Sequence, residues 1–331
     1  MNQKLTKNER RELAREQARI AREAEKKREK RNRLMLQGGI VLVVVAILGV
    51  VALVLSQSMK PAGPGPLNMI SGGVTFGSDL EVVETPALQD GEEREARDAD
   101  WTTTPIDVTV YVDYMCPACG NFEQQNGTML EQYVGSGDVN LTVYPINFLD
   151  AQSVGAKYST RAANLVSCVV EQQPESAFAL HNRLLSAEVQ PAEQTTGLTD
   201  DQLLEQAEAA GATLDTELKQ CVKDQRFASF ISANYKQVSE RGILGLAEGA
   251  QLMDPRSGEL VPADQPQRLM STPTVIVNGQ QWVSGRDGTL EEYLLKIKSQ
   301  LDGNGSEEEP AEGEAPAEAD AAADAAEAPA E

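Results

Sequence analysis

The chain has 331 residues, with 51 Asp/Glu against 29 Lys/Arg and one His, and its formal net charge is -22. This length exceeds that of an ordinary single domain and predicts a division into segments. Residues 1–33 hold 13 Lys/Arg and 6 Asp/Glu, whereas residues 302–331 hold 11 acidic residues and no basic one. The acidic remainder excludes a strongly basic surface after residue 33, so nucleic acid is not an expected partner. A single histidine excludes His-rich metal sites, which leaves the four cysteines as the most reactive groups.

An uncharged apolar run of 22 residues occupies positions 34–55. At about 1.5 Å per residue, a helix of this length crosses a hydrocarbon core of about 30 Å. The basic excess of residues 1–33 is typical of a cytoplasmic side, so we expect everything after residue 55 to face outward. A cleavable secretory signal is the alternative, although such signals have shorter basic and apolar regions. The sequence therefore predicts a single-pass cell-membrane protein with a cytoplasmic N-terminus and an extracytoplasmic C-terminal domain.

Two segments of biased composition flank the main domain. Residues 56–78 are rich in Gly and Pro and are predicted to be a linker. Residues 302–331 consist mainly of Ala, Glu, Pro and Asp without an aromatic residue, which predicts a disordered acidic tail. Residues 79–301 remain as one domain that carries a sizeable insertion.

The main domain opens with a strand, a helix and a second strand. Residues 106–112 (IDVTVYV) are β-branched and aromatic and predict a buried strand. A helix is expected over 117–134, because proline is tolerated in the first turn of a helix. Residues 139–145 (VNLTVYP) alternate apolar and polar positions and predict the second strand. Such a short strand–helix–strand succession indicates a parallel crossover unit.

A block of helices follows, and then strands return. We expect a helical insertion over about 152–245, with helices at 154–172, 176–187, 199–210, 214–222 and 225–240. Residues 274–278 and 280–284 flank the Asn278-Gly279 turn and predict a hairpin. A last helix is expected over 289–301. The order βαβ, helices, ββα predicts an α/β fold.

The motif Cys116-Pro117-Ala118-Cys119 falls where the first strand ends and its helix begins. Unpaired N–H groups and the helix dipole at that point stabilise a thiolate on Cys116. A stabilised thiolate is a good leaving group and makes the disulfide a better oxidant. We expect Cys119, one turn inside the helix, to be more shielded and to act as the resolving thiol.

Cysteines in such a pattern have two other uses, metal binding and structural disulfides. Half of a zinc site is one, but Cys168, Cys221 and His181 form no second close pair, so we expect no metal and no other cofactor. The single His181 is expected on a helix surface. Outside the cytoplasm, Cys168 and Cys221 are expected to form a structural disulfide. A second catalytic pair is the alternative, although these two cysteines are far apart in sequence and lie in predicted helices.

With the motif 116–119, the strand before it and Thr272-Pro273 ahead of a later strand, the chain resembles DsbA-like thiol-disulfide oxidoreductases of the thioredoxin superfamily. The resemblance covers roughly residues 80–301. It implies a thioredoxin-like fold with an inserted helical domain, catalytic Cys116 and Cys119, and a cis-proline loop at Thr272-Pro273 that pairs with substrate backbone.

The chain departs from the family pattern at two places. Members often carry a histidine between the cysteines, and Pro117-Ala118 lacks it, which implies a less oxidising disulfide. Many superfamily members bury a carboxylate where this chain has Val110. Asp113 is interpreted in two ways, as a substitute proton acceptor or as a residue that only caps the loop.

The resemblance implies an extracytoplasmic oxidase that introduces disulfides into exported proteins. The expected partners are reduced or unfolded exported proteins and a quinone-linked membrane oxidase, DsbB-like or VKOR-like, that restores the disulfide. A thiol reductase or disulfide isomerase with the same site is an alternative, because the direction depends on the redox potential. A non-enzymatic membrane-tethered binding protein with an inert Cys pair is another.

Overall fold

The structure is a computed structural model that describes residues 64–304 and scattered earlier residues (16, 19, 22, 23, 25–28, 30, 35, 45 and 47–49). The predicted basic segment, the anchor at 34–55 and the acidic tail from residue 305 onward therefore lie wholly or mostly outside the described residues. Within the described part of the chain, no helix is both long and apolar enough to cross a bilayer. The chain divides into two compact units, Met1–Pro61 and Ala62–Glu331, and the elements below belong to the second unit.

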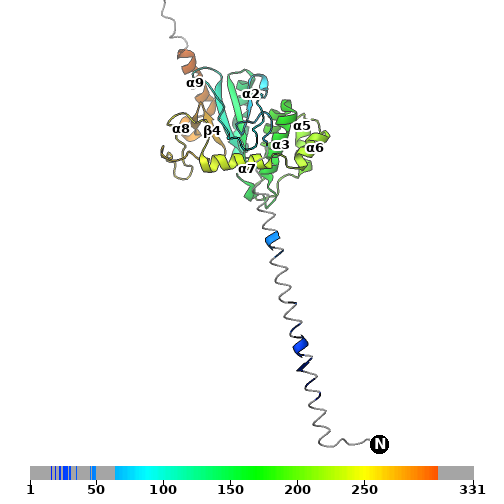
Figure 1. Ribbon diagram of the computed structural model, residues 1–331. Helices are drawn as coiled ribbons and strands as arrows, with labels where there is room; N and C mark the ends of the chain where they lie inside the picture. Colours follow the sequence, from blue (N-terminus) through cyan, green and yellow to red (C-terminus); the bar gives the residue numbers. More distant parts are fainter. Residues whose placement is uncertain are drawn as a thin grey trace, which may run out of the picture. The chain divides into compact units, whose positions relative to one another are not determined.

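A five-stranded mixed sheet forms the centre of the second unit (Figure 1). Its order is β1-β3-β2-β4-β5, and only the pair β2–β3 is parallel. The helix α2 connects these two strands, which confirms the predicted crossover unit. The strands are β1 (Val74–Phe76), β2 (Ile106–Val112), β3 (Val139–Pro145), β4 (Thr274–Val277) and β5 (Gln280–Trp282), and α2 is Pro117–Gly135.

Each face of the sheet is covered by its own apolar cluster. Val108 and Val110 of β2 belong to the larger cluster, together with residues of α2 and of α9 (Leu290–Asn304). Tyr111 points to the opposite face, because side chains alternate along a strand. There it stacks on Tyr144 of β3 with ring centroids 4.7 Å apart, in the smaller cluster. The sheet is thus covered on both faces, with the motif-bearing helix on the side of the larger cluster.

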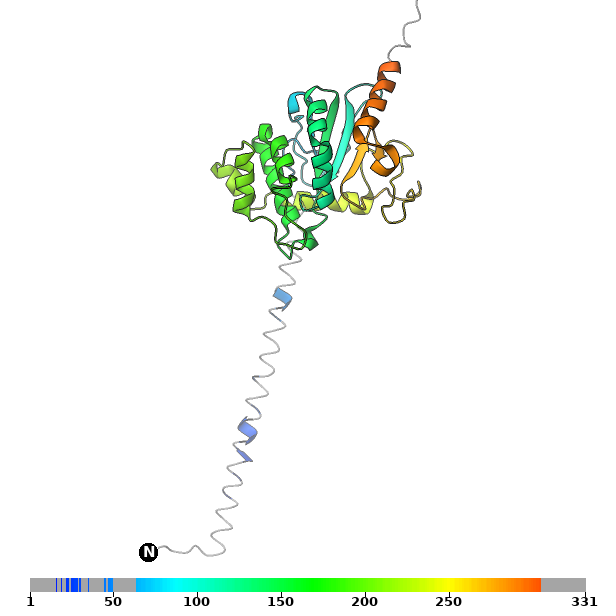
Figure 2. The ribbon, with the colours of Figure 1, turned by 180° about the vertical axis from the view of Figure 1, so that it is seen from behind.

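Helices α3 to α6 gather at one side of the sheet, away from α8 and α9, whereas α7 runs along the lower edge of the sheet, as the two opposite views show (Figures 1 and 2). The predicted capping box at the start of α5 is present, with Thr199 and Gln202 each accepting from the other's backbone N–H. The helices are α3 (Tyr158–Gln172), α4 (Ala177–Leu184), α5 (Asp200–Ala209), α6 (Thr216–Lys223), α7 (Ala228–Lys236) and the four-residue α8 (Ser284–Asp287). Shorter turns are η1 (Ser78–Leu80), η2 (Asp150–Gln152), η3 (Pro174–Ser176) and η4 (Gln237–Arg241).

The predicted linker 56–78 is wrong from residue 64 onward. Met69, Val74 and Phe76 are wholly buried, and β1 pairs antiparallel with β3. The glycines of this segment allow close packing: a Cβ at Gly73 would lie 2.7 Å from the Tyr144 ring, and Gly72 has a φ of 108°. The domain therefore includes the residues from 64 onward, and the glycines at 72 and 73 reflect contact with an aromatic side chain.

Several predicted element boundaries also need correction. The helix expected at 154–172 begins at Tyr158, because Val154 and Lys157 adopt positive φ angles of 52° and 49° that no right-handed helix accommodates. The strand expected at 280–284 ends at Trp282 and leads directly into α8. The last helix extends to Asn304, so residues 302–304 are helical and do not belong to the tail.

Candidate active site

The motif cysteines lie at the junction of β2 and α2. The strand ends at Val112 and the helix begins at Pro117, so Cys116 occupies the N-cap position. The N–H groups of Cys119 and Gly120 donate to the Cys116 carbonyl at 3.0 and 3.1 Å and close the first turn. Cys116 is 7% exposed and Cys119 is 0% exposed, and both are free thiols. A thiol arriving from solvent therefore meets Cys116 first.

The Thr272-Pro273 loop lies against the same sulfur. The bond between these two residues is cis, as the resemblance implied. Because β4 runs antiparallel to β2 with Tyr111 opposite Thr274, the residues before β4 lie beside those that follow β2. The Cys116 thiol donates to the Thr272 carbonyl at 3.3 Å. Sheet register thus brings together two motifs that are more than 150 residues apart in the sequence.

The two motif thiols differ strongly in acidity. The pKa of Cys116 is lowered to about 6, first by the hydrogen bond from the Cys119 thiol and then by the Thr272 side chain and the N–H groups of Cys119 and Ala118, which together outweigh burial. Burial raises the pKa of Cys119 well above its ordinary value, and the contact with Cys116 raises it further. At neutral pH the pair therefore holds a thiolate at 116 and a thiol at 119. The main-chain donors expected from the sequence contribute, but the second thiol contributes most.

Asp113 is wholly buried and accepts three hydrogen bonds. Its Oδ1 accepts from the Met115 N–H at 2.8 Å and from the Ser159 hydroxyl at 2.7 Å, and its Oδ2 accepts from the Leu149 N–H at 2.7 Å. Burial raises its pKa to about 7, against the effect of these donors, and the Cys116 charge raises it slightly further. Asp113 thus caps the loop through the Met115 N–H, and its pKa of about 7 is compatible with the proton-acceptor interpretation, which stays a prediction.

A second buried polar group, His181 in α4, was missed by sequence reasoning. The expectation of a surface position for His181 is wrong, because the residue is 2% exposed. Its Nδ1 lies 3.2 Å from the Tyr114 hydroxyl, and its Nε2 lies 3.5 Å from Oε2 of Glu123. A signal was present: His181 continues the buried stripe of Phe178 and Leu185 at helical spacing.

Gln190, which follows α4, was also missed. Its Nε2 donates to the Cys116 carbonyl at 2.9 Å and to the Tyr114 carbonyl at 3.4 Å. A Cβ at Gly120 would lie only 2.2 Å from its Oε1, so the glycine leaves room for the amide. No local pattern predicts this contact, because Gln190 belongs to the inserted block and α2 to the sheet domain.

Cys168 and Cys221 are joined in a disulfide that connects α3 to α6. Their Cα atoms are 6.1 Å apart, the sequence separation is 53 residues, and both residues are 0% exposed. The bond lies in the apolar core of the helical insertion. This pairing agrees with the structural disulfide expected from the sequence and leaves neither cysteine as a free thiol.

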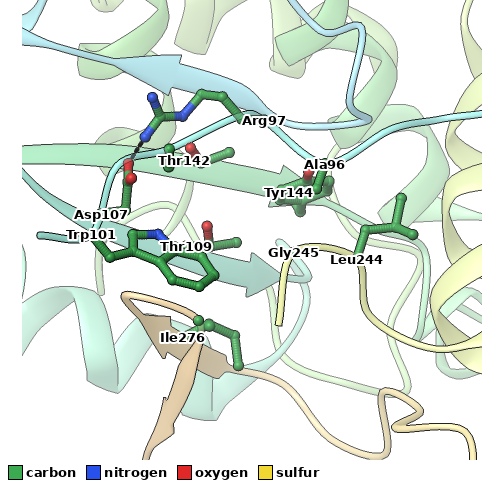
Figure 3. A pocket seen from close by; sticks show the side chains of 12 residues that line it. Ala96, Arg97, Trp101, Asp107, Thr109, Thr142, Tyr144, Leu244, Gly245 and Ile276 are labelled. Carbon is green, nitrogen blue, oxygen red and sulfur yellow. Dashed lines mark ion pairs between the residues drawn. The ribbon is translucent and has the colours of Figure 1, made fainter. Parts of the chain in front are cut away.

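A small cavity of about 40 Å³ lies on the other face of the sheet, away from the cysteines (Figure 3). Thr109, Thr142 and Ile276 point into it from three strands, and Arg97 forms an ion pair with Asp107 at its rim. None of the predicted site residues lines it. The cavity has room for water only and is not a candidate for the chemistry of the motif.

Comparison with known proteins adds a match to one sequence family. The profile of a family described as "Thioredoxin" matches residues 102–245, from just before β2 into the segment after η4. Serine/threonine-protein kinase PknE of Mycobacterium tuberculosis is 28% identical over 113 residues, which is 34% of this chain and 20% of the kinase. The same kinase of Mycobacterium bovis matches equally. The chain thus matches only about a fifth of the length of these curated relatives.

Solved structures with a similar backbone come from several bacteria. The reduced disulfide bond oxidoreductase DsbG of Mycobacterium tuberculosis has 23% identity and a TM-score of 0.47, over 72% of this chain and 94% of that one. Reduced DsbA of the same organism has 21% identity and a TM-score of 0.46, over 70% and 99%. Oxidised BdbD of Bacillus subtilis has 19% identity and a TM-score of 0.45, over 73% and 100%. The strand order, the parallel crossover and the family match identify a mixed α/β, thioredoxin-like fold that carries an inserted helical block.

Proposed function

We propose that the chain is an extracytoplasmic protein thiol-disulfide oxidoreductase that introduces disulfides into exported proteins. One observation carries the proposal: Cys116 has a pKa of about 6 and lies beside a wholly buried partner thiol, 3.3 Å from the Thr272 carbonyl. A stabilised Cys116 thiolate favours the reduced pair, so the oxidised pair passes its disulfide on readily. This favours an oxidase over a reductase with the same site.

The reaction proceeds in two exchanges. A substrate thiolate attacks the sulfur of Cys116, a substrate–Cys116 disulfide forms, and the Cys116–Cys119 bond breaks with the electron pair on Cys119. A second substrate thiolate then attacks the substrate sulfur of the mixed disulfide and releases Cys116 as a thiolate. The substrate loses two electrons, which the cysteine pair gains.

Two further residues support these exchanges. The backbone of Thr272 lies beside Cys116 and is available to pair with an extended substrate segment, which would orient the attacking sulfur. Asp113 has a pKa of about 7, so it exchanges a proton readily at neutral pH and can protonate Cys119 as that thiolate leaves. Asp113 is therefore assigned as the proton donor and acceptor of the site.

Location and partners complete the proposal. The apolar run 34–55 serves as a membrane anchor, with residues 1–33 in the cytoplasm. Reduced or unfolded exported proteins are the substrates. A quinone-linked membrane oxidase, DsbB-like or VKOR-like, reoxidises the pair, and tethering both proteins in one membrane raises their effective concentration.

The test mixes the oxidised full-length chain, in detergent, with reduced and unfolded ribonuclease A. Disulfides should appear in the ribonuclease at a rate that the Cys116→Ser variant does not support. The redox potential measured against glutathione then decides whether the pair oxidises or reduces its substrates. A value of about -120 mV supports an oxidase, and a value of about -270 mV supports a reductase. No exchange and an ordinary thiol pKa of about 8.5 would indicate the inert binding protein.

A further inference from the structure

The redox cycle creates a problem of proton access. Cys119 is 0% exposed, and its pKa is raised well above the ordinary value, so the reduced pair carries a proton on this sulfur. Each reduction must deliver that proton to a buried atom, and each oxidation must remove it. Asp113 can hold a proton near the pair, but it is also 0% exposed and is surrounded by its three donors. A route to solvent is still required.

Tyr114 lies at the buried end of such a route. It is 0% exposed, and its hydroxyl lies 3.2 Å from Nδ1 of His181. Burial raises the pKa of Tyr114 well above its usual range, and electrostatic interactions with Glu123, Tyr158, Cys119 and Asp113 raise it further. The phenol therefore stays protonated and interacts electrostatically with both the resolving thiol and the proton-holding carboxyl.

Glu123 lies at the outer end. Its Oε2 is 3.5 Å from the second ring nitrogen of His181, and its side chain is 11% exposed against 3% for the histidine side chain. Glu123 follows Cys119 by four residues in α2, so the two residues lie on one face of the helix, about 6 Å apart at Cβ. The three side chains therefore form a series from the wholly buried Tyr114, which interacts electrostatically with Cys119, to a carboxylate whose side chain is 11% exposed.

We propose that Tyr114, His181 and Glu123 form a proton relay between the buried Cys119 site and solvent. The inference rests on the proposed redox function of Cys116 and Cys119. A phenol and an imidazole suit this role, because each can accept a proton at one position while it donates another. A carboxylate at the surface end exchanges protons directly with water.

The proton balance of one turnover agrees with a single relay. Two substrate thiols enter with two protons, and the substrate leaves as a disulfide. Cys116 is released as a thiolate, whereas Cys119 takes up one proton, so the other proton goes to solvent. Reoxidation by the membrane partner removes the Cys119 proton along the same three side chains in the opposite direction.

A relay changes rates in both directions without changing the equilibrium, which separates it from an electrostatic role. In the full-length chain, the Cys116–Cys119 disulfide is reduced by dithiothreitol and re-formed by oxidised glutathione, with both rates followed by stopped flow from pH 5 to 9. Tyr114→Phe and His181→Gln should slow both reactions by a similar factor of about ten or more. The redox potential should stay unchanged. Imidazole added to His181→Gly should restore part of the rate.

Matched controls lie elsewhere in the same domain. Tyr111→Phe removes another buried phenol of the β2 region, and Glu171→Gln neutralises a carboxylate that pairs with Arg226 at 3.1 Å on the surface of the insertion. Both should leave both rates unchanged. An unchanged rate in Tyr114→Phe, or a loss in one direction with a shifted potential, overturns the relay. If His181→Gly does not fold, Tyr114→Phe still decides, because it deletes only one oxygen.

These outcomes are separate from those that test the proposed function. If the wild-type chain exchanges with dithiothreitol and glutathione but does not oxidise unfolded ribonuclease, the oxidase proposal fails and the relay remains open to the same rate test. If the wild-type chain exchanges with neither reagent, both proposals are overturned.

Discussion

The two cysteine pairs of this chain consist of the same atoms in opposite surroundings. Cys116 and Cys119 lie in the first turn of a helix, with polar donors and the Thr272 carbonyl around the first sulfur. Cys168 and Cys221 connect two helices across 53 residues of sequence and lie among apolar side chains. Cys116 of the first pair is 7% exposed, whereas both cysteines of the second pair are 0% exposed.

This difference separates reactivity from stabilisation. A thiolate reacts only where donors stabilise its charge and where another sulfur can approach it, and both conditions hold at Cys116 alone. On the chain-entropy model a crosslink stabilises a fold more when it closes a longer loop, with a logarithmic dependence on loop length, and only the second pair closes a long loop. The comparison predicts that each pair can be removed without loss of what the other one does.

The largest effect is expected for Cys116 itself. In the reduced native chain, iodoacetamide should label Cys116 and leave Cys119 unlabelled, because Cys119 is wholly buried and its thiol is not acidic. The labelling rate should rise with pH through a midpoint of about 6, the pKa of Cys116. Mass spectrometry identifies the labelled residue. Fast labelling of the Cys116→Ser variant, or a labelling midpoint at a pH of about 8.5, would contradict the assignment of Cys116 as the accessible and acidic thiol.

Removing the second pair should change stability and leave the exchange chemistry intact. The Cys168→Ala/Cys221→Ala variant loses a crosslink that closes a loop of 53 residues, so its free energy of unfolding should fall by about 4 kcal/mol. Urea unfolding measures the loss. The matched control is the Cys116→Ala/Cys119→Ala variant, compared with the oxidised wild-type chain. The Cys116–Cys119 disulfide closes a far shorter loop than the Cys168–Cys221 disulfide, so its removal should lower the free energy of unfolding less. A lower rate of thiol-disulfide exchange in the folded fraction of the Cys168→Ala/Cys221→Ala variant would contradict the prediction that this pair serves stability alone.

Asp113→Asn tests the environment that the first pair has and the second lacks. The pKa of Asp113 is raised to about 7 in the native state, above the unfolded value of about 3.9. The folded protein therefore binds more protons between these values. Stability from this group is complete below about pH 4 and falls by about 1.4 kcal/mol per pH unit until about pH 7. In the variant this decline should be absent.

The measurement compares urea unfolding of the reduced wild-type and variant chains between pH 4 and 5, where Cys116, with a pKa of about 6, is still mostly protonated. The variant also loses hydrogen bonds, for example that from the Leu149 N–H, and this lowers its stability at every pH. Only the slope reports the raised pKa. Parallel curves for the two proteins would show that the carboxyl is charged throughout.

Much of this comparison could be predicted from the sequence, because it depends on local patterns. The strands 106–112 and 139–145 have the predicted limits, since β-branched runs between turn residues specify strands. The motif 116–119 fell at the strand–helix junction because proline marks the start of the helix. The position of the Thr272-Pro273 loop beside Cys116 could be proposed only through the resemblance to a known family.

The features that the sequence did not predict depend on contacts between segments that are distant in the chain. Strand β1 was hidden in a Gly-rich stretch, because the need for those glycines comes from the Tyr144 ring some seventy residues later. The spacing of His181 from Phe178 and Leu185 indicates its burial, but nothing in its own helix indicates that its partner is the phenol of Tyr114. The contact of Gln190 with the Cys116 carbonyl likewise joins the insertion to the sheet domain.

The smallest expected effect concerns the side chain of Thr272. Its contact with Cys116 lowers the thiol pKa, but less than the Cys119 hydrogen bond does. Apart from the sulfur contact, the buried Thr272 hydroxyl has no hydrogen-bond partner in the described part of the chain, so Thr272→Val leaves no other group unpaired. The variant should raise the pH midpoint for alkylation of Cys116 slightly and make the disulfide slightly less oxidising.

The Cys119→Ala variant should raise this midpoint more, because it removes the largest cause of the low pKa of Cys116. Equal midpoints in Thr272→Val and wild type would show that the Thr272 hydroxyl does not lower the pKa of Cys116.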